Sequence, residues 1–129
     1  MANQARILLF NMNNDRQRSI ERLCRSLSIK TSYIRSTSYH DTLGYLTGIQ
    51  GFPKKPVSPS ASPATSELES EMLVFSGMDS DATDAFLAAF KNAGLPPIAL
   101  KAILTPTNVF WTPIKLYEEL CKEHKLLHP

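Results

Sequence analysis

Five residues of types that bind small ligands gather between positions 101 and 111. They are Lys101, Thr105, Thr107, Asn108 and Trp111, in the stretch LKAILTPTNVFWT, which reads as a strand, a polar turn and the approach to a helix. A cation, two hydroxyl groups and an amide at this spacing could hold a small anionic or polar ligand beside a helix N-terminus, where free backbone N–H groups favour negative charge. These residues are therefore the candidate ligand-binding site.

The same segment also suits a structural role. Thr112 followed by Pro113 is a helix N-cap and first-turn pair, and Asn108 can close an Asx-turn. A lysine between apolar neighbours, as at Lys101, is typical of a guarded edge strand. Trp111 precedes the cap, where an apolar ring can staple the helix onto a sheet. We expect the segment to be chiefly a clasp between strand and helix, with ligand binding secondary.

Two other groups of side chains invite a chemical interpretation. Cys121, His124 and His128 have the i, i+3, i+7 spacing of one helix stripe. All three can bind zinc, yet a single helix supplies no fourth ligand. We therefore predict no metal site there.

Ser38, His40 and Asp41 have the side chains of a catalytic triad but lie too close along the chain, because triads are assembled from separate elements. Initiation of a helix by Ser38 or Asp41 is the better interpretation. The sequence also contains no GxGxxG, Walker, HExxH or CxxC motif. No catalytic residue and no cofactor is predicted.

Two stretches of the chain share one plan of strand, helix and strand, which indicates an internal repeat. In the first, a strand over 8–10 precedes a helix that starts at 13–15. Its buried face has the spacing of one helix stripe and comprises Ile20, Leu23, Cys24 and Leu27. The opposite face carries Arg18, Arg22 and Arg25.

In the second stretch, a strand over 72–75 precedes a helix that starts at 79–81 and stops at Gly94. Its inward side chains are expected to be Phe86, Leu87 and Phe90. The Pro96-Pro97 pair then forbids continuation of the helix.

The strand patterns indicate an α+β fold. ILLF and MLVF are apolar throughout and should be central, whereas the strands around Ile34 and Lys101 alternate and should lie at the edges. This favours a ferredoxin-like split βαβ sandwich of order 4-1-3-2, with two βαβ units plus a C-terminal helix. A four-stranded parallel α/β sheet of order 2-1-3-4 is the alternative.

Residues 1–129 are expected to form a single domain of two halves, about 5–49 and 71–127. The intervening stretch 51–70 contains four prolines, is rich in serine and has almost nothing to bury. This composition is typical of a flexible linker.

The charge distribution is asymmetric although the net charge is only +2. Residues 1–50 contain seven Lys/Arg and three Asp/Glu (7 − 3 = +4), and residues 66–129 contain five and nine (5 − 9 = −4). The asymmetry could orient a charged partner, but it falls short of the clustered basic surface of a nucleic-acid-binding protein.

The two cysteines, Cys24 and Cys121, occupy apolar positions of predicted helices, which fits unoxidised thiols and a reducing cytoplasm. The N-terminal apolar run is too short for a signal peptide, and no apolar stretch approaches a membrane-spanning length. We expect a cytoplasmic protein without a membrane partner.

A family resemblance covers residues 71–124. It is carried by F-S-G-M after a strand, by L-K-A-I-L-T-P-T-N, by W-T and L-Y-E-E-L, and by the Glu123-His124 pair. With these motifs the segment resembles a bacterial family of uncharacterised proteins, domain of unknown function 3783. The resemblance implies a bacterial source and a shared structural unit, and it implies no activity. Residues 1–70 lie outside it.

These features favour a binding module over an enzyme. We expect a protein that associates with itself, for example as a homodimer, or that binds another protein or a small anionic ligand. One alternative is an enzyme acting on a small polar or anionic substrate through Lys101, Thr105 and Asn108. The other is a nucleic-acid-binding module that uses the basic first helix.

Overall fold

The computed structural model describes residues 5–35, 38–39, 41–49, 51 and 70–127, and the side chains of these residues up to Glu123. All but the two ends of the predicted linker 51–70 lie outside these ranges. Among the described residues, no helix is both long enough and apolar enough to cross a bilayer.

The first βαβ unit consists of β1 (Arg6–Phe10), α1 (Asn14–Ser26) and β2 (Lys30–Ile34). The helix starts within the predicted range 13–15, and Asn13 is its N-cap, because its side chain accepts a hydrogen bond of 2.8 Å from the Arg16 backbone N–H. The predicted inward stripe faces the sheet, with Ile20 and Cys24 buried and the two leucines partly buried. The three arginines of the opposite face are exposed.

The second unit consists of β3 (Met72–Ser76), α3 (Ser80–Asn92) and β4 (Leu100–Ile103). Asp79 caps α3 by accepting from the Ala82 N–H at 2.8 Å, and Gly94, with φ 73°, turns the chain after the helix. Phe86 and Phe90 are buried as predicted, but Leu87 is 36% exposed. The prediction for Leu87 was wrong because β4 is the last strand of the sheet in the described part of the chain, so this flank of α3 is left uncovered there.

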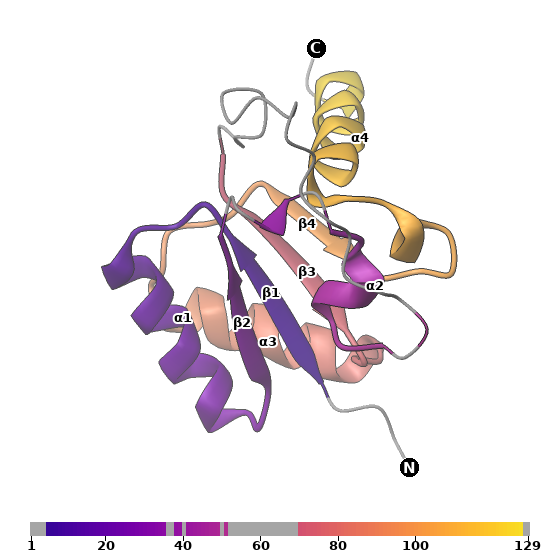
Figure 1. The fold of residues 1–129 in the computed structure, drawn as a ribbon. Helices are drawn as coiled ribbons and strands as arrows, with labels where there is room; N and C mark the ends of the chain where they lie inside the picture. The colour runs from indigo at the N-terminus through magenta and orange to yellow at the C-terminus, as the bar shows by residue number, and fades with distance from the viewer. Residues whose placement is uncertain (1–4, 36–37, 40, 50, 52–69, 128–129) are drawn as a thin grey trace.

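The four strands form one mixed sheet in the order β2-β1-β3-β4 (Figure 1). Within each unit the two strands are neighbours and run parallel, and the units meet through an antiparallel pairing of β1 with β3. The apolar strands are central and the alternating strands are at the edges, as predicted. The α+β class is thus correct.

The ferredoxin-like order 4-1-3-2 is not the one found. In that arrangement a strand of the other unit separates the two strands of each βαβ unit, whereas here each helix returns the chain to the adjacent position. The parallel alternative has the observed strand order, but it is wrong for β1 and β3, which run antiparallel to each other. Because β3 is antiparallel to β1, it starts at the end of the sheet where β2 finishes, so the connection needs no helix running back along the sheet.

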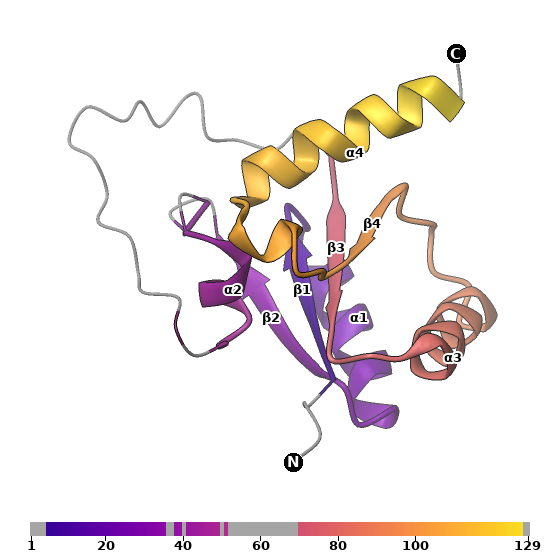
Figure 2. The same cartoon turned by 90° about the vertical axis from the view of Figure 1, so that its right-hand side faces the viewer.

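Helices cover both faces of the sheet (Figures 1 and 2). On one face α1 and α3 pack against alternate residues of the central strands. The other face is covered by α2 (Leu43–Leu46), the 3₁₀ turn η3 (Asn108–Phe110) and α4 (Pro113–Leu127). The side chains at the centre of this second core include Phe10, Val74 and Leu116.

The short helix α2 starts one residue later than the sequence suggested. Thr42 is its N-cap and accepts a hydrogen bond of 3.2 Å from the Tyr45 N–H. The expectation that Ser38 or Asp41 would start this helix was therefore wrong. Asp41 is instead fully buried beside the second core, and His40 lies outside the described residues.

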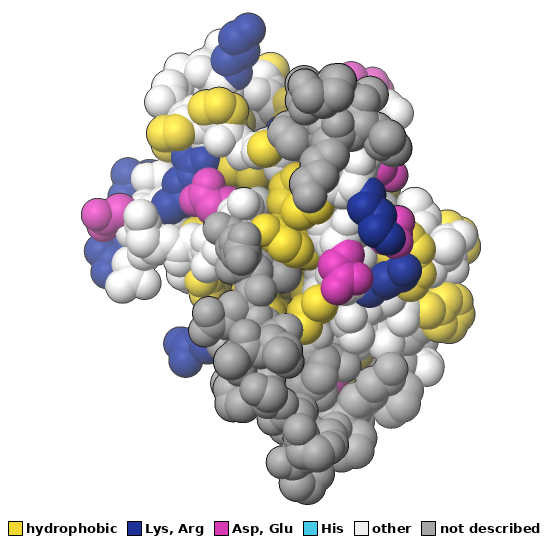
Figure 3. Space-filling view, turned by 90° about the horizontal axis from the view of Figure 1, so that it is seen from above, with side chains coloured by type: hydrophobic (Ala, Val, Ile, Leu, Met, Phe, Trp, Pro, Cys, Tyr) yellow, Lys and Arg dark blue, Asp and Glu magenta, His cyan; other side chains and the backbone are white. Residues whose placement is uncertain are grey.

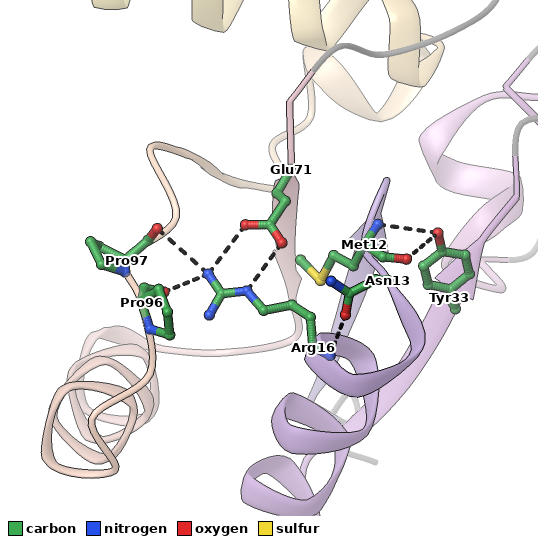
Figure 4. A network of polar contacts seen from close by, with 7 residues as sticks. All are labelled: Met12, Asn13, Arg16, Tyr33, Glu71, Pro96 and Pro97. Atoms are coloured by element: carbon green, nitrogen blue, oxygen red, sulfur yellow. Dashed lines mark hydrogen bonds and ion pairs between the residues drawn. The ribbon is translucent and has the colours of Figure 1, made fainter.

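A polar network around Arg16 joins the two units (Figure 4). The side chain is only 9% exposed, and its Nε and Nη2 donate to the two carboxylate oxygens of Glu71 at 3.1 and 3.2 Å. Nη2 also donates to the carbonyls of Pro96 and Pro97, and the guanidinium carbon lies 5.4 Å from the centre of the Phe90 ring. Arg16 therefore links α1 to β3, α3 and the segment before β4.

Loss of this link should destabilise the fold. Arg16→Met keeps much of the apolar stem but leaves Glu71 and two carbonyl groups without their donor, so we expect a loss of about 2 to 3 kcal/mol. Arg18→Met on the exposed face of α1 is the control and should change stability by less than about 0.5 kcal/mol. Urea unfolding followed by circular dichroism measures both, and equal midpoints for the two variants would contradict this role of Arg16.

The two free thiols have different surroundings. Cys24 is fully buried, and its burial, with a smaller effect of the Glu21 carboxylate, raises the pKa of its thiol from 9.0 to about 12. Cys121 is partly exposed on α4 and packs at the border of the second core. Both are unpaired, as expected.

Because Cys121 is partly exposed and Cys24 is fully buried, Cys121 should react with a disulfide reagent at pH 8, and Cys24 should react only on unfolding. Above pH 9 the unfolded chain loses the Cys24 proton while the folded chain keeps it up to about pH 12, so this thiol destabilises the fold progressively across that range. Thiol counting in native and denaturing buffer, with Cys121→Ala to isolate Cys24, checks the first point. Rapid labelling of Cys24 in the native protein would show that it is accessible.

Candidate functional site

All five candidate residues line a single open groove of about 540 Å³. The groove runs beside β4 and is bordered by α4, η3 and the flank of α3; we call it the β4–α4 groove. Lys101 comes from β4, Thr105, Thr107 and Asn108 from the segment that follows, and Trp111 from the end of η3. The remaining lining residues are Phe75, Thr83, Leu87, Ala102, Ile103, Leu116, Glu119, Leu120 and Glu123.

Lys101 is an exposed residue of an edge strand, as predicted. It pairs in register with Leu73 of β3, whose side chain faces α3, so the lysine stem lies on the α3 face of the sheet. Its ammonium group donates to the carbonyl of Ile98, three residues earlier. The charge therefore stays at the rim of the groove.

Asn108 is only 7% exposed, and both ends of its amide hold the backbone at the end of β4. Its Oδ1 accepts from the Thr105 N–H at 2.8 Å, and its Nδ2 donates to the Ile103 carbonyl at 3.0 Å. The Thr105 hydroxyl oxygen in turn accepts from the Asn108 N–H at 3.0 Å and from the Thr107 N–H at 3.3 Å. Asn108 thus reaches back to the strand instead of closing the expected Asx-turn.

The Asn108 amide occupies positions that a neighbouring strand would otherwise use. Leu104 donates its N–H to Phe75 of β3 at 2.9 Å, so by alternation Ile103 and Thr105 direct their backbone groups to the free edge. The amide replaces a partner strand for the Ile103 carbonyl and the Thr105 N–H. It therefore closes the free edge at the end of β4.

Trp111 joins three elements. Its backbone N–H donates to the Asn108 carbonyl at 2.9 Å, and its carbonyl accepts from the Leu43 N–H of α2 at 2.8 Å. The partly buried ring packs against the second core, with the Lys115 ammonium 5.6 Å from its centre. Thr112, the next residue, caps α4 by accepting from the Lys115 N–H at 3.2 Å. These contacts agree with a clasp between the sheet and α4.

Two carboxylates on α4 also line the groove, and the sequence analysis missed them. Glu119 accepts from Lys115 at 2.9 Å and lies 3.5 Å from Lys122, and the hydrogen bond from Lys115 holds the pKa of Glu119 below its usual value. Glu123 stands one helical turn further on. The signal in the sequence was the i, i+4 spacing of Glu119 and Glu123. Carboxylates accept hydrogen bonds and do not donate them, so this wall offers a small anion no donor from Glu119 or Glu123.

The remaining chemical candidates do not form a site among the described residues. The side chains of His124 and His128 lie outside what the structure describes. Within the described part of the chain, no three His, Cys, Asp or Glu side chains are placed to hold a metal ion.

The clasp can be tested by mutation. Asn108→Ala leaves the Thr105 N–H and the Ile103 carbonyl without this partner, so we expect a loss of about 2 kcal/mol. Trp111→Ala should cost about 3 kcal/mol through lost packing. Lys101→Met, in the same groove, is the control and should be nearly neutral, since the ammonium group is at the surface. Unchanged melting temperatures for both Asn108→Ala and Trp111→Ala would rule out the clasp.

Comparison with known proteins gives one match. No curated protein and no solved structure matches the chain. A family model matches the second unit together with η3 and α4, and so includes every residue that lines the β4–α4 groove. This model is that of the family described as Domain of unknown function (DUF3783), and its match spans residues 71–127.

Proposed function

We propose that the protein is a non-enzymatic binding module that contacts another protein chain through the β4–α4 groove. The observation that carries the proposal is the exposure of large apolar side chains beside a free sheet edge. Ile103 is 54% exposed in the groove, and Phe110 on the bordering η3 is 66% exposed. Exposed apolar side chains beside an open edge are typical of a surface that another chain covers.

The backbone of β4 supports an extended protein segment as the partner. Lys101 and Ile103 direct backbone groups away from β3, and the Ile103 carbonyl is already bonded to Asn108. A segment lying along β4 can therefore pair at Lys101 and at the Ile103 N–H, and pairing ends at Asn108. Recognition by strand addition uses such main-chain bonds for affinity and the flanking grooves for specificity.

A small anion is less well supported as the ligand. The Thr105 oxygen and the Asn108 amide hold the local backbone, and Glu119 and Glu123 stand on the opposite wall. The same engagement of Thr105 and Asn108 weighs against an enzyme that would use them on a substrate. We therefore propose Lys101 and the exposed apolar residues as the contact surface.

A nucleic-acid-binding role also has less support. The exposed arginines of α1 lie on a helix that also carries Asp15 and Glu21. On the face seen in Figure 3, basic and acidic side chains are scattered around apolar ones without forming a basic patch.

We place the protein in the bacterial cytoplasm, because two unpaired thiols suit a reducing compartment.

The proposal is tested with displayed peptide segments of about a dozen residues, selected on the wild-type protein. Binders should lose at least tenfold in affinity on Ile103→Lys and on Phe110→Ser, because both changes place polar groups on the proposed contact surface. Ile49→Lys is the matched control, since Ile49 is 41% exposed near α2, away from the groove.

Sedimentation velocity over a range of protein concentrations tests a second copy as the partner. A dimer that dissociates in Ile103→Lys and persists in Ile49→Lys would identify self-association as the function of the groove. A wild-type protein that stays monomeric and yields only peptides insensitive to Ile103→Lys and Phe110→Ser would reject the proposal.

A further inference from the structure

A second cavity, of about 370 Å³, lies between β4 and α3, next to the β4–α4 groove. Phe86, Leu87 and Phe90 of α3 form much of its wall, and Ile98 closes it from the segment before β4. Its lining is predominantly apolar, and its size is within the range of pockets that hold small molecules. This cavity is separate from the clasp residues Thr105, Asn108 and Trp111.

The charges at this cavity have one sign. Of the described charged residues, Lys91, in the last turn of α3, and Lys101, on β4, line it, and no described aspartate or glutamate does. Both lysines are exposed, so their ammonium groups are hydrated at the mouth while their stems contact the apolar wall. The β4–α4 groove differs, because Glu119 and Glu123 line it.

An apolar chamber with two cations at its mouth matches an amphipathic anion. We propose that the cavity binds a small apolar carboxylate of the fatty-acid type, with the acyl chain against Phe86, Leu87 and Phe90 and the carboxylate at Lys91 and Lys101. Lys101 is able to exchange its hydrogen bond to the Ile98 carbonyl for a charge-assisted bond to the ligand. Leu87 and Lys101 line both this cavity and the β4–α4 groove, but peptide binding and carboxylate binding are measured separately, so the two proposals can fail separately.

Decanoate at monomeric concentration is the probe, titrated calorimetrically into the full chain. We expect saturable binding of one molecule, at least tenfold tighter than that of decanol, which has the same chain without the charge. Octanoate should bind more weakly than decanoate by about fourfold for each methylene lost from the cavity. The double variant Lys91→Gln/Lys101→Gln should lose at least tenfold for decanoate and little for decanol.

Two variants of Leu87 with side chains of similar size separate the effect of charge on binding from the effect of shape. Leu87 is 36% exposed and lines the cavity, so both Leu87→Gln and Leu87→Glu should fold, which urea midpoints check. The carboxylate of Leu87→Glu should weaken decanoate binding at least tenfold relative to Leu87→Gln, whereas Lys122→Gln on α4 should have no effect. If either Leu87 variant fails to fold, the lysine double variant and the comparison with decanol decide whether the cavity binds a carboxylate.

Several results would overturn the proposal. They are absence of saturable decanoate binding, equal affinity for decanoate and decanol, and equal affinity of Leu87→Gln and Leu87→Glu. Uptake of many molecules per chain, or binding to anionic phospholipid vesicles without binding of monomeric decanoate, would equally reject a defined carboxylate site.

Discussion

The antiparallel pairing of β1 with β3 is the interaction on which the rest of the structure depends. Each βαβ unit alone would present its central strand as an open apolar edge, and this pairing removes both edges at once. Leu8 stands opposite Val74 at the middle of the ladder. Because β1 and β3 are antiparallel, the strands of the two units run in opposite directions. The Arg16 link to Glu71 reinforces the same boundary from one end of the sheet.

The central pair also explains why two cores form from a chain of this size. Successive residues of β1 and β3 point to opposite faces, so each face of the sheet must be covered. The crossover helices α1 and α3 cover one face, and the other is left to α2, η3 and α4. The segment between β4 and α4 contains the unusual residues of the sequence, and its Asn108 and Trp111 bond to the end of β4 and to α2.

The outer edge differs from the centre of the sheet, because among the described strands β4 has a neighbour on one side only. Asn108 closes the edge beyond Ile103, while Lys101 keeps a charge on the part that remains open. The β4–α4 groove and the cavity beside α3 are neighbours along this short strand, and Lys101 lines both. A single edge strand therefore contributes to two chemically different surfaces: among the described residues, carboxylates line the groove, and the charged residues that line the cavity are lysines.

The sequence by itself determined the local structure and the positions of the strands. The caps at Asn13, Asp79 and Thr112, the inward stripe of α1 and the central or edge character of the strands depend on local hydrogen bonding and on periodicity. The five candidate residues chosen from the sequence all line one groove. Only the tertiary structure decided the strand directions, since an apolar strand buried on both faces has the same composition in a parallel and an antiparallel pair. It also decided the exposure of Leu87, the reach of Asn108 back to β4 and the approach of Glu119 and Glu123, because these depend on where α3 and α4 end up relative to a sheet edge.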